Sequence, residues 1–473
     1  MMPESTLWCL STTEVYPFSK IGGLGDYCYS FAKGLRDRGH EVMVFSPYYE
    51  KHMLPLTAEL DYQIEPRTIT FRKRELSYLS MSCTYEGITY VFFRYAPFWG
   101  HDTMFLDDCK RYNENLNGST LLGKAMSIEL RIRLQAESGN RRLVVQGNDA
   151  LSSFFAPYIQ AEAFPNVQVT KLYAVHSFVG EAVGRIYRMD EYYLDQEFKA
   201  LIDRDFSREK SWLEVLTPHF DRFITVSPNY VTEITSGETS LSKLFSRMHQ
   251  EGRLAGFLNG IDDAFWSIHS SPLLGREEGD TLSALKHRYK AKLCRRIGLS
   301  LEKPLLVFVG RITPQKGLQR LNDMLALLPD SHIVILGQGE PLEHYITEPY
   351  RKQVTHFDHY EEQLCHEVLA AADYSIVPSE YEPCGYVAMY APRFGVIPLV
   401  RETGGLVNIA ASVESVLQVP ILFDTADQFA RLYSGLLVRN LHESDTLREK
   451  LSHLTWRWDE TLEQMELFVL SHT

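Results

Sequence analysis

The stretch FSKIGGLGDYCYSFAKGLRDRG, Phe18–Gly39, links two apolar segments in the N-terminal part of the chain. Large apolar side chains recur every four residues from Tyr27 onward, which predicts a helix directly after the glycines. The flanking segments STLWCLSTTE (Ser5–Glu14) and HEVMVFS (His40–Ser46) are typical of short buried strands. Together the three segments predict a βαβ unit whose first turn is rich in glycine.

The same alternation returns in the second half of the chain. Strand-like segments are PLLVFVGR (Pro304–Arg311), HIVILG (His332–Gly337), YSIVPS (Tyr374–Ser379) and GVIPLV (Gly395–Val400). Helical patterns, GLQRLNDMLALLP and EEQLCHEVLAAAD, lie between them. Strands that alternate with helices predict an α/β fold with parallel, doubly wound sheets.

The length of 473 residues predicts two domains rather than one core. We place an N-terminal domain at 1–266, a polar hinge at 267–303 and a C-terminal domain at 304–473, with the last helix returning towards the first domain. Two such domains around a hinge would form a cleft. Ligands of these folds lie at the carboxyl ends of the strands, so the loops there are the place to look for chemistry.

Charge and cysteine content exclude several classes of protein. The net charge of −13 argues against nucleic acid as a partner, because phosphate backbones bind basic surfaces. Seven scattered cysteines without a CxxC pair predict neither a disulfide framework nor a zinc site, and no metal ligand set is expected. No signal peptide and no membrane-spanning run are visible, so we expect a cytoplasmic protein, with export by a signal-independent route as the alternative.

Glycine-rich loops at strand ends indicate sites for an anion. Gly22 and Gly23 expose backbone N–H groups at a helix start, and Lys20 adds a positive charge, so the turn suits a phosphate. The alternative is a plain tight turn. Arg311 and Lys316 in VFVGRITPQKGL follow a strand and suit a diphosphate, unless they are solvated surface cations.

Two further loops offer polar groups for a sugar. Glu382 in VPSEYEPCGY follows a strand, and its carboxylate suits hydrogen bonds to sugar hydroxyls or backbone N–H groups. Glu380 is two residues away, so one of the two is expected to be a solvated rim residue. The loop LVRETGGL again places paired glycines before a helix. His176 ends an apolar run, where a structural role is the alternative. Cys384 is expected to pack rather than to act as a nucleophile.

In this order the segments KIGGLGD, FITVSPNYVTEI, EGRLAGFLNGIDDAFW, VGRITPQKG, PSEYEPCGY and PLVRETGGL resemble bacterial glycogen synthase and plant starch synthase. The matching segments run almost end to end. The resemblance implies a GT-B fold of two Rossmann-like domains. It also implies a retaining glucosyltransferase without cofactor or metal, which moves glucose from ADP-glucose, or less often UDP-glucose, to the non-reducing end of an α-1,4-glucan.

The resemblance also implies roles for individual residues. It implies catalytic roles for Glu382, which holds the transferred glucose, for His176 at the reacting centre, and for the diphosphate cations Arg311 and Lys316. Donor-side residues would be Lys20, Gly22, Gly23, Gln315, Ser379, Cys384, Gly404 and Gly405. Acceptor-side residues would be Asp26, Asp149 and Asn259.

The departures from the family pattern lie on the acceptor side. The family's HDWHT is GNDALSS here, so Asp149 is kept but the tryptophan position is Ala150. Tyr386 begins the replacement of the Leu-Thr-Gln that follows EPCG in the family. Two alternatives therefore stay open: the same transfer to a protein or small-molecule acceptor, and an inactive protein that only binds a nucleotide sugar.

Overall fold

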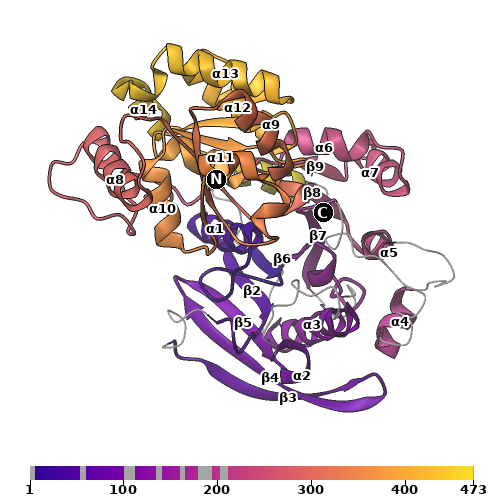
Figure 1. The fold of residues 1–473 in the computed structure, drawn as a ribbon. Coiled ribbons are helices and arrows are strands. Elements are labelled where there is room, and N and C mark those ends of the chain that lie inside the picture. Colours follow the sequence, from indigo (N-terminus) through magenta and orange to yellow (C-terminus); the bar gives the residue numbers. More distant parts are fainter. Residues whose placement is uncertain are drawn as a thin grey trace. The chain divides into compact units, whose positions relative to one another are not determined.

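A computed structural model describes residues 6–53, 60–100, 112–134, 141–159, 164, 166–178, 194–202 and 211–471, apart from the side chains of 112–114. Cys109 and the first residue of the expected strand, Ser5, lie outside the described residues. The chain divides into two compact units (Figure 1). The first unit comprises Met1–Val226, Val231–Phe257 and Trp458–Thr473, and the second comprises Ser227–Tyr230 and Leu258–Arg457.

The first unit is built on a nine-stranded sheet with the order β3-β4-β5-β2-β1-β6-β7-β8-β9. The strands are β1 (Leu7–Ser11), β2 (Glu41–Pro47), β3 (Gln63–Phe71), β4 (Arg74–Tyr85), β5 (Ile88–Arg94), β6 (Arg141–Asn148), β7 (Val167–Val175), β8 (Arg222–Thr225) and β9 (Leu254–Gly256). The predicted βαβ unit is present, because β1 pairs in parallel with β2 and helix α1 (Gly23–Asp37) joins them.

The parallel pairing that the sequence predicts does not extend over the whole of this sheet. β4 pairs antiparallel with both β3 and β5 at one side of the sheet. Each hairpin closes through two residues of positive φ, namely Arg72 and Lys73 in the first and Glu86 and Gly87 in the second. Two consecutive residues of this kind form the tight turn whose twist matches that of a hairpin. The Arg-Lys pair lacks the glycine by which such a turn is recognised in a sequence.

The other helices that the structure describes wholly or mainly in the first unit are α2 (Ala96–Trp99), α3 (Tyr112–Leu134), α4 (Gln196–Ile202), α5 (Trp212–Leu216), α6 (Pro228–Thr235), α7 (Ser240–Gln250) and α15 (Trp458–Leu470). The last helix, α15, returns to the first unit. Its Trp458 ring packs edge-on against the rings of Tyr27 and Phe31 of α1. Arg38 Nε donates to Glu466 Oε1 over 2.6 Å, and His40 contacts the same oxygen.

The second unit has a six-stranded, fully parallel sheet with the order β12-β11-β10-β13-β14-β15. The strands are β10 (Leu305–Val309), β11 (His332–Leu336), β12 (Val354–Phe357), β13 (Tyr374–Val377), β14 (Ile397–Arg401) and β15 (Leu422–Phe423). The order steps outward from β10 in both directions, which is the doubly wound topology that the sequence predicts. In this topology the loops after β10, β13 and β14 lie next to one another at one edge.

Helices of the second unit are α8 (Leu282–Ile297), α9 (Leu321–Leu327), α10 (Glu362–Ala371), α11 (Tyr386–Arg393), α12 (Gly405–Leu417), α13 (Ala426–Val438) and α14 (Asp445–Ser452). The segment 267–303, for which we expected a hinge, lies within this unit and carries α8. Helix α8 packs against α10, and the buried Lys286 Nζ of α8 donates to the carbonyls of Ala370, Ala372 and Phe394. Although this segment has a polar sequence, it contains a helix that is anchored by one buried lysine side chain.

The core of each unit consists of its strands and the inward faces of its helices. Strands β1 and β10 are completely buried, as expected for central strands covered on both faces. Among the helices that the structure describes, none combines the length and the apolar character needed to cross a bilayer.

Candidate active site

The glycine turn after β1 is closed by a buried carboxylate of the same unit. Glu14 Oε2 accepts hydrogen bonds from the backbone N–H groups of Ile21 and, over 3.0 Å, of Gly22. These are amide groups that the sequence suggested for a phosphate. Burial raises the pKa of Glu14 to about 7, although the two backbone hydrogen bonds act in the opposite direction. Glu14 thus holds the shape of the turn from within.

Lys20 and Asp26 form an ion pair across this turn. Lys20 Nζ lies 2.8 Å from Asp26 Oδ1, and both side chains keep a small exposed fraction. Gly25 lies against the Lys20 stem, where a Cβ atom would come within 3.2 Å of Lys20 Cγ. Gly23, the first residue of α1, is exposed. The turn therefore presents one cation and one carboxylate together at the start of α1.

Asp149 and His176 follow the neighbouring strands β6 and β7 and meet at their carboxyl ends. Asp149 Oδ1 accepts from the backbone N–H of His176 over 2.8 Å. Asp149 has φ +60°, in the left-handed region that few residues other than glycine adopt. Burial raises the pKa of Asp149 to about 7 and lowers the pKa of His176 to about 3. The His176 imidazole is therefore neutral at physiological pH.

A chain of amide side chains fixes the tautomer of His176. Asn148 Nδ2 donates to the carbonyl of Ser11, so Asn148 Oδ1 points the other way. That oxygen lies 2.9 Å from His176 Nε2 and also accepts from Gln146 Nε2. Because an amide oxygen only accepts, Nε2 must carry the proton, and Nδ1 keeps its lone pair. The Tyr27 ring lies edge-on against the imidazole with centroids 4.4 Å apart.

In the second unit Glu382 is the centre of a compact polar cluster. Lys316 Nζ lies 2.7 Å from Glu382 Oε2, and Ser379 Oγ donates to the same oxygen over 2.8 Å. Glu382 is 9% exposed, and Lys316 keeps about a fifth of its side chain at the surface. Both hydrogen bonds use Oε2, and among the described residues Oε1 accepts none. The cluster thus combines a cation with one unused carboxylate oxygen.

Glycines allow the loops after β10, β13 and β14 to pack closely against one another. Gly405 N donates to the carbonyl of Glu382 over 2.9 Å. A Cβ atom at Gly404 would lie 2.0 Å from the Glu382 carbonyl oxygen, and one at Gly317 would lie 1.9 Å from that of Pro378. Both glycines have φ between +48° and +73°. Gly404 and Gly405, in the loop after β14, therefore position Glu382, and this role is structural.

Glu380, the neighbouring carboxylate of this loop, pairs with two arginines. Arg320 Nε and Arg401 Nη1 lie 2.8 and 2.9 Å from its two carboxylate oxygens. Hydrogen bonds from Arg320 lower the pKa of Glu380, and the charges of both arginines act in the same direction. Glu380 N also donates to the Gln315 carbonyl over 2.8 Å. This network ties the loop after β10 to the loop after β13.

The remaining predicted residues of the second unit surround this cluster. Arg311 is exposed, and its Nη2 lies 3.5 Å from Gln315 Oε1. Asn259 is buried, and its Nδ2 donates to the hydroxyl of Tyr386 over 3.2 Å. Cys384 is buried, which raises the pKa of its thiol and agrees with the expectation that it packs. Arg311 is thus the cation of this set that is most open to a ligand.

Within each unit the structure brings the predicted residues together. In the first unit these are Lys20, Gly22, Gly23, Asp26, Asp149 and His176. In the second unit they are Asn259, Arg311, Gln315, Lys316, Ser379, Glu382, Cys384, Gly404 and Gly405. Sequence reasoning missed Glu14, Asn148 and the arginines that hold Glu380. The only signal for Glu14 was its place as the last residue of an apolar strand segment, which does not distinguish a buried carboxylate from a surface one.

Two α/β units with strand-end clusters of this composition define a GT-B glycosyltransferase. The profile described as "Starch synthase catalytic domain" matches residues 9–258, and the one described as "Glycosyl transferases group 1" matches residues 290–434. The first match covers more than half of the chain. The chain therefore belongs to the starch synthase catalytic domain family, and it is a glycosyltransferase of the glycogen and starch synthase type.

Individual relatives are similar over most of their length. The glycogen synthase of Glaesserella parasuis is 29% identical over 413 residues, which cover 84% of this chain and 83% of that protein. The granule-bound starch synthase 1 of Pisum sativum is 27% identical, with 84% and 70% covered. The catalytic domain of Arabidopsis thaliana starch synthase IV, solved with ADP and acarbose, superposes with a TM-score of 0.82 at 22% identity and 99% coverage of both chains. The last similarity supports the fold.

Proposed function

We propose that this chain is a retaining glucosyltransferase that moves glucose from ADP-glucose, or less favourably UDP-glucose, to the non-reducing end of an α-1,4-glucan. The observation that carries the proposal is the cluster of Glu382, Lys316 and Ser379. The names of the relatives support a glucan product, and ADP in the Arabidopsis structure supports the nucleotide. The nucleotide sugar is a co-substrate, and the proposed transfer uses no further cofactor or metal.

The second-unit cluster would act on the donor. As the bond between C1 of glucose and the diphosphate breaks, negative charge grows on the leaving diphosphate. Lys316 and Arg311 supply positive charge for that change, and loss of one such group costs about a hundredfold or more in rate. Lys316 would exchange part of its pairing with Glu382 for the diphosphate. The unused Oε1 of Glu382 would accept a hydrogen bond from a hydroxyl of the transferred glucose. We therefore assign this carboxylate no nucleophilic role.

The first-unit cluster would act near the reacting centre and on the acceptor. His176 stays neutral because burial holds its pKa at about 3. It would therefore contact the sugar as a neutral imidazole whose Nδ1 accepts, and it would add no charge. From the glycine turn, Lys20 would contact the phosphates of the donor, and Asp26 would contribute near the acceptor. In the second unit, Asn259 would contribute on the acceptor side.

A second candidate function has one specific observation in its favour. Ala150, at the family's tryptophan position, is fully buried in a short 3-10 helix, Ala150–Ser152. This position therefore offers no ring on which an acceptor glucose could stack. The same donor chemistry with a protein or small-molecule acceptor is the alternative, and a protein that only binds the nucleotide sugar is the third possibility.

A donor panel separates these functions. Nucleotide release is measured from ADP-glucose and UDP-glucose, with and without glycogen, for the wild type and for Arg311→Ala, Lys316→Ala and Glu382→Gln. Arg351→Ala, which removes an exposed arginine paired with Glu348, is the control. We expect glycogen-dependent release of ADP, with about a hundredfold loss in each site variant and none in the control.

Other outcomes of the donor panel would each support one of the alternative functions. Turnover of the donor without incorporation into glycogen would support a different acceptor. Tight binding without turnover would support the binding protein. Equal rates in the site variants and the control would exclude the cluster as the catalytic centre.

A cytoplasmic location is part of the proposal, because the six cysteines that the structure describes are buried free thiols.

A further inference from the structure

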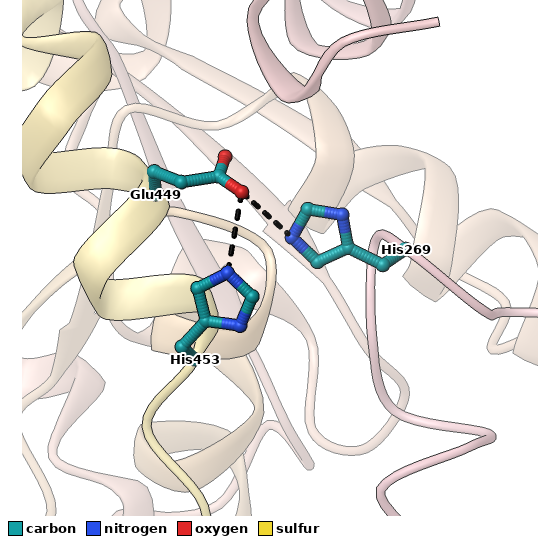
Figure 2. Close-up of side chains that lie close together, drawn as sticks. All are labelled: His269, Glu449 and His453. Carbon is teal, nitrogen blue, oxygen red and sulfur yellow. Dashed lines mark ion pairs between the residues drawn. The ribbon is translucent and has the colours of Figure 1, made fainter. Parts of the chain in front are cut away.

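Three side chains of metal-binding type converge on the second unit, and none of them is among the residues proposed for glucose transfer. His269 lies in a turn that precedes α8, Glu449 lies on α14, and His453 directly follows that helix. Their ligand atoms all lie within 4.8 Å of one another. Figure 2 shows both imidazoles directed towards one oxygen of Glu449, with distances of 3.8 Å from His269 Nε2 and 3.3 Å from His453 Nε2.

The two segments that carry these ligands are fixed to one another by a buried arginine. The carbonyl of Arg393 accepts from Ile268 N over 3.2 Å, next to His269 in the turn. The guanidinium of the same residue donates to the carbonyl of Leu454 over 3.2 Å and to that of Ser452, at the end of α14. Because Arg393 is 8% exposed, this link lies in the interior. The backbone segments that carry the three ligands are therefore held in a fixed position relative to one another.

The ligands themselves lie where an ion can reach them. The side chains of His269, Glu449 and His453 are 31%, 48% and 67% exposed. The two imidazole rings are nearly parallel, with an interplanar angle of 7° and centroids 5.4 Å apart. A zinc ion binds imidazole nitrogen and carboxylate oxygen at about 2.0–2.2 Å. Small rotations of the exposed Glu449 and His453 side chains would bring the three donors to such distances.

The surrounding charges and hydrogen bonds set the conditions for binding. His269 Nε2 lies 2.8 Å from Ser452 Oγ, so an ion would replace this hydrogen bond. Burial lowers the pKa of His269, the Glu449 carboxylate opposes this, and the positive charges of His453, Arg276 and Arg393 act with burial. The Arg393 guanidinium donates to backbone carbonyls and lies 3.7 Å from Asp263 Oδ1.

We propose that His269, Glu449 and His453 form a binding site for a divalent transition metal ion of the zinc type, with water completing a tetrahedral shell. Two imidazoles and one carboxylate suit Zn²⁺, whereas Mg²⁺ and Ca²⁺ prefer oxygen ligands alone. The bound ion would connect the turn at 267–271 to the end of α14. The proposed ion has no part in the proposed glucose transfer. The proposal departs from the sequence-based prediction that the chain holds no metal ligand set.

The test is zinc titration of the full chain, freed of metal with a chelator and of any affinity tag, by isothermal calorimetry at pH 7.5. We expect a site of micromolar affinity that weakens by more than about tenfold in His269→Ala and in His453→Ala. His344→Ala is the control, because His344 is a similarly exposed histidine to His453 and lies 3.9 Å from Glu340, with no third metal ligand nearby among the residues that the structure describes. Mg²⁺ should produce no comparable heat.

Thermal unfolding with and without ZnCl₂ provides a second readout that does not depend on activity. Metal that binds only the folded chain raises the melting temperature, and we expect this increase in the wild type and the His344→Ala control. It should be lost in His453→Ala, whose exposed side chain can be removed without disturbing the interior. Equal zinc affinity and equal thermal shifts in all variants would overturn the proposal, as would the absence of zinc binding to the wild type.

Discussion

Replacing Gly317 by alanine tests whether the loop that carries Lys316 is as tightly packed as the structure indicates. Gly317 has φ +73°, and an added Cβ would lie 1.9 Å from the carbonyl oxygen of Pro378. Real Cβ contacts are essentially never shorter than 3.0 Å, so the two loops must separate by about 1.1 Å (3.0 minus 1.9). Pro378 immediately precedes Ser379, which donates to Glu382, so the shift acts directly on the cluster.

A second glycine separates the two destabilising effects of Gly317→Ala, namely the conformational free energy of alanine at positive φ and the overpacking against Pro378. Gly298, at the end of α8, has φ +69°, and an added Cβ there meets nothing within 4 Å. Gly298→Ala therefore carries only the conformational cost of alanine at positive φ, about 1–2 kcal/mol. Gly317→Ala carries the same cost plus overpacking, about 1–3 kcal/mol more. Both glycines belong to the second unit, so their effects are compared within one unfolding transition.

The assay is urea unfolding of the wild type and both variants, together with donor-dependent nucleotide release. We expect Gly317→Ala to lower the free energy of unfolding by about 2–5 kcal/mol and to reduce the turnover rate by tenfold or more. Gly298→Ala should lower the free energy by about 1–2 kcal/mol with turnover unchanged. If the two variants lose the same stability within about 0.5 kcal/mol, the inferred contact between the loops is wrong.

Three further predictions concern buried charges. Because the folded pKa of Glu14 is raised to about 7, its protonated form favours folding, and the first unit should lose on the order of 3 kcal/mol as pH rises from about 4.5 through 7. Unfolding at pH 5 to 8 should show a smaller slope in Glu14→Gln, and an unchanged slope would contradict this. Lys286→Ala leaves three buried carbonyls without their donor and should cost about 3–5 kcal/mol in urea unfolding, whereas the exposed Lys292→Ala should cost less than about 1 kcal/mol. Burial alone would raise the pKa of Glu466, but hydrogen bonds from Arg38 and His40, which follow α1, lower it to about 2. The contribution of Glu466 to stability is therefore present above about pH 4.5 and is lost as pH falls through 2. At pH 7, Glu466→Gln should therefore destabilise the first unit by about 1–3 kcal/mol, with the exposed Glu463→Gln as control, and equal melting curves of the two variants would refute the anchoring role of Glu466.

Local patterns in the sequence predicted the parts of the fold that depend on neighbouring residues. The βαβ unit around Phe18–Gly39 and the strands at 304–311, 332–337 and 374–379 follow from periodicity, and the structure contains β1, β2, β10, β11 and β13 there. The hairpin turn at Arg72 and Lys73 was missed, because its two residues adopt positive φ without the glycine that marks such turns. Helix α8 was missed, because its exposed face makes the segment read as polar.

The residues proposed for catalysis were found from the sequence, but their relations were not. Lys316 and Glu382 were each placed at a strand end, yet their ion pair joins residues 66 positions apart. The occupation of the Ile21 and Gly22 amides by Glu14 was also not foreseen. A buried carboxylate has the same sequence signature as an exposed one, and only the packing of its surroundings distinguishes them.

The sequence by itself determined the α/β class, the strand ends where polar loops gather, and the family to which the chain is similar. These properties depend on local periodicity, on glycine and charge at fixed spacing, and on the order of motifs. The tertiary structure alone decided that Glu14 closes the glycine turn, that Asn148 fixes the proton of His176 on Nε2, and that His269 meets Glu449 and His453. The physical reason is that hydrogen bonds and pKa values depend on distance and burial, which are set when remote strands and loops are packed against one another.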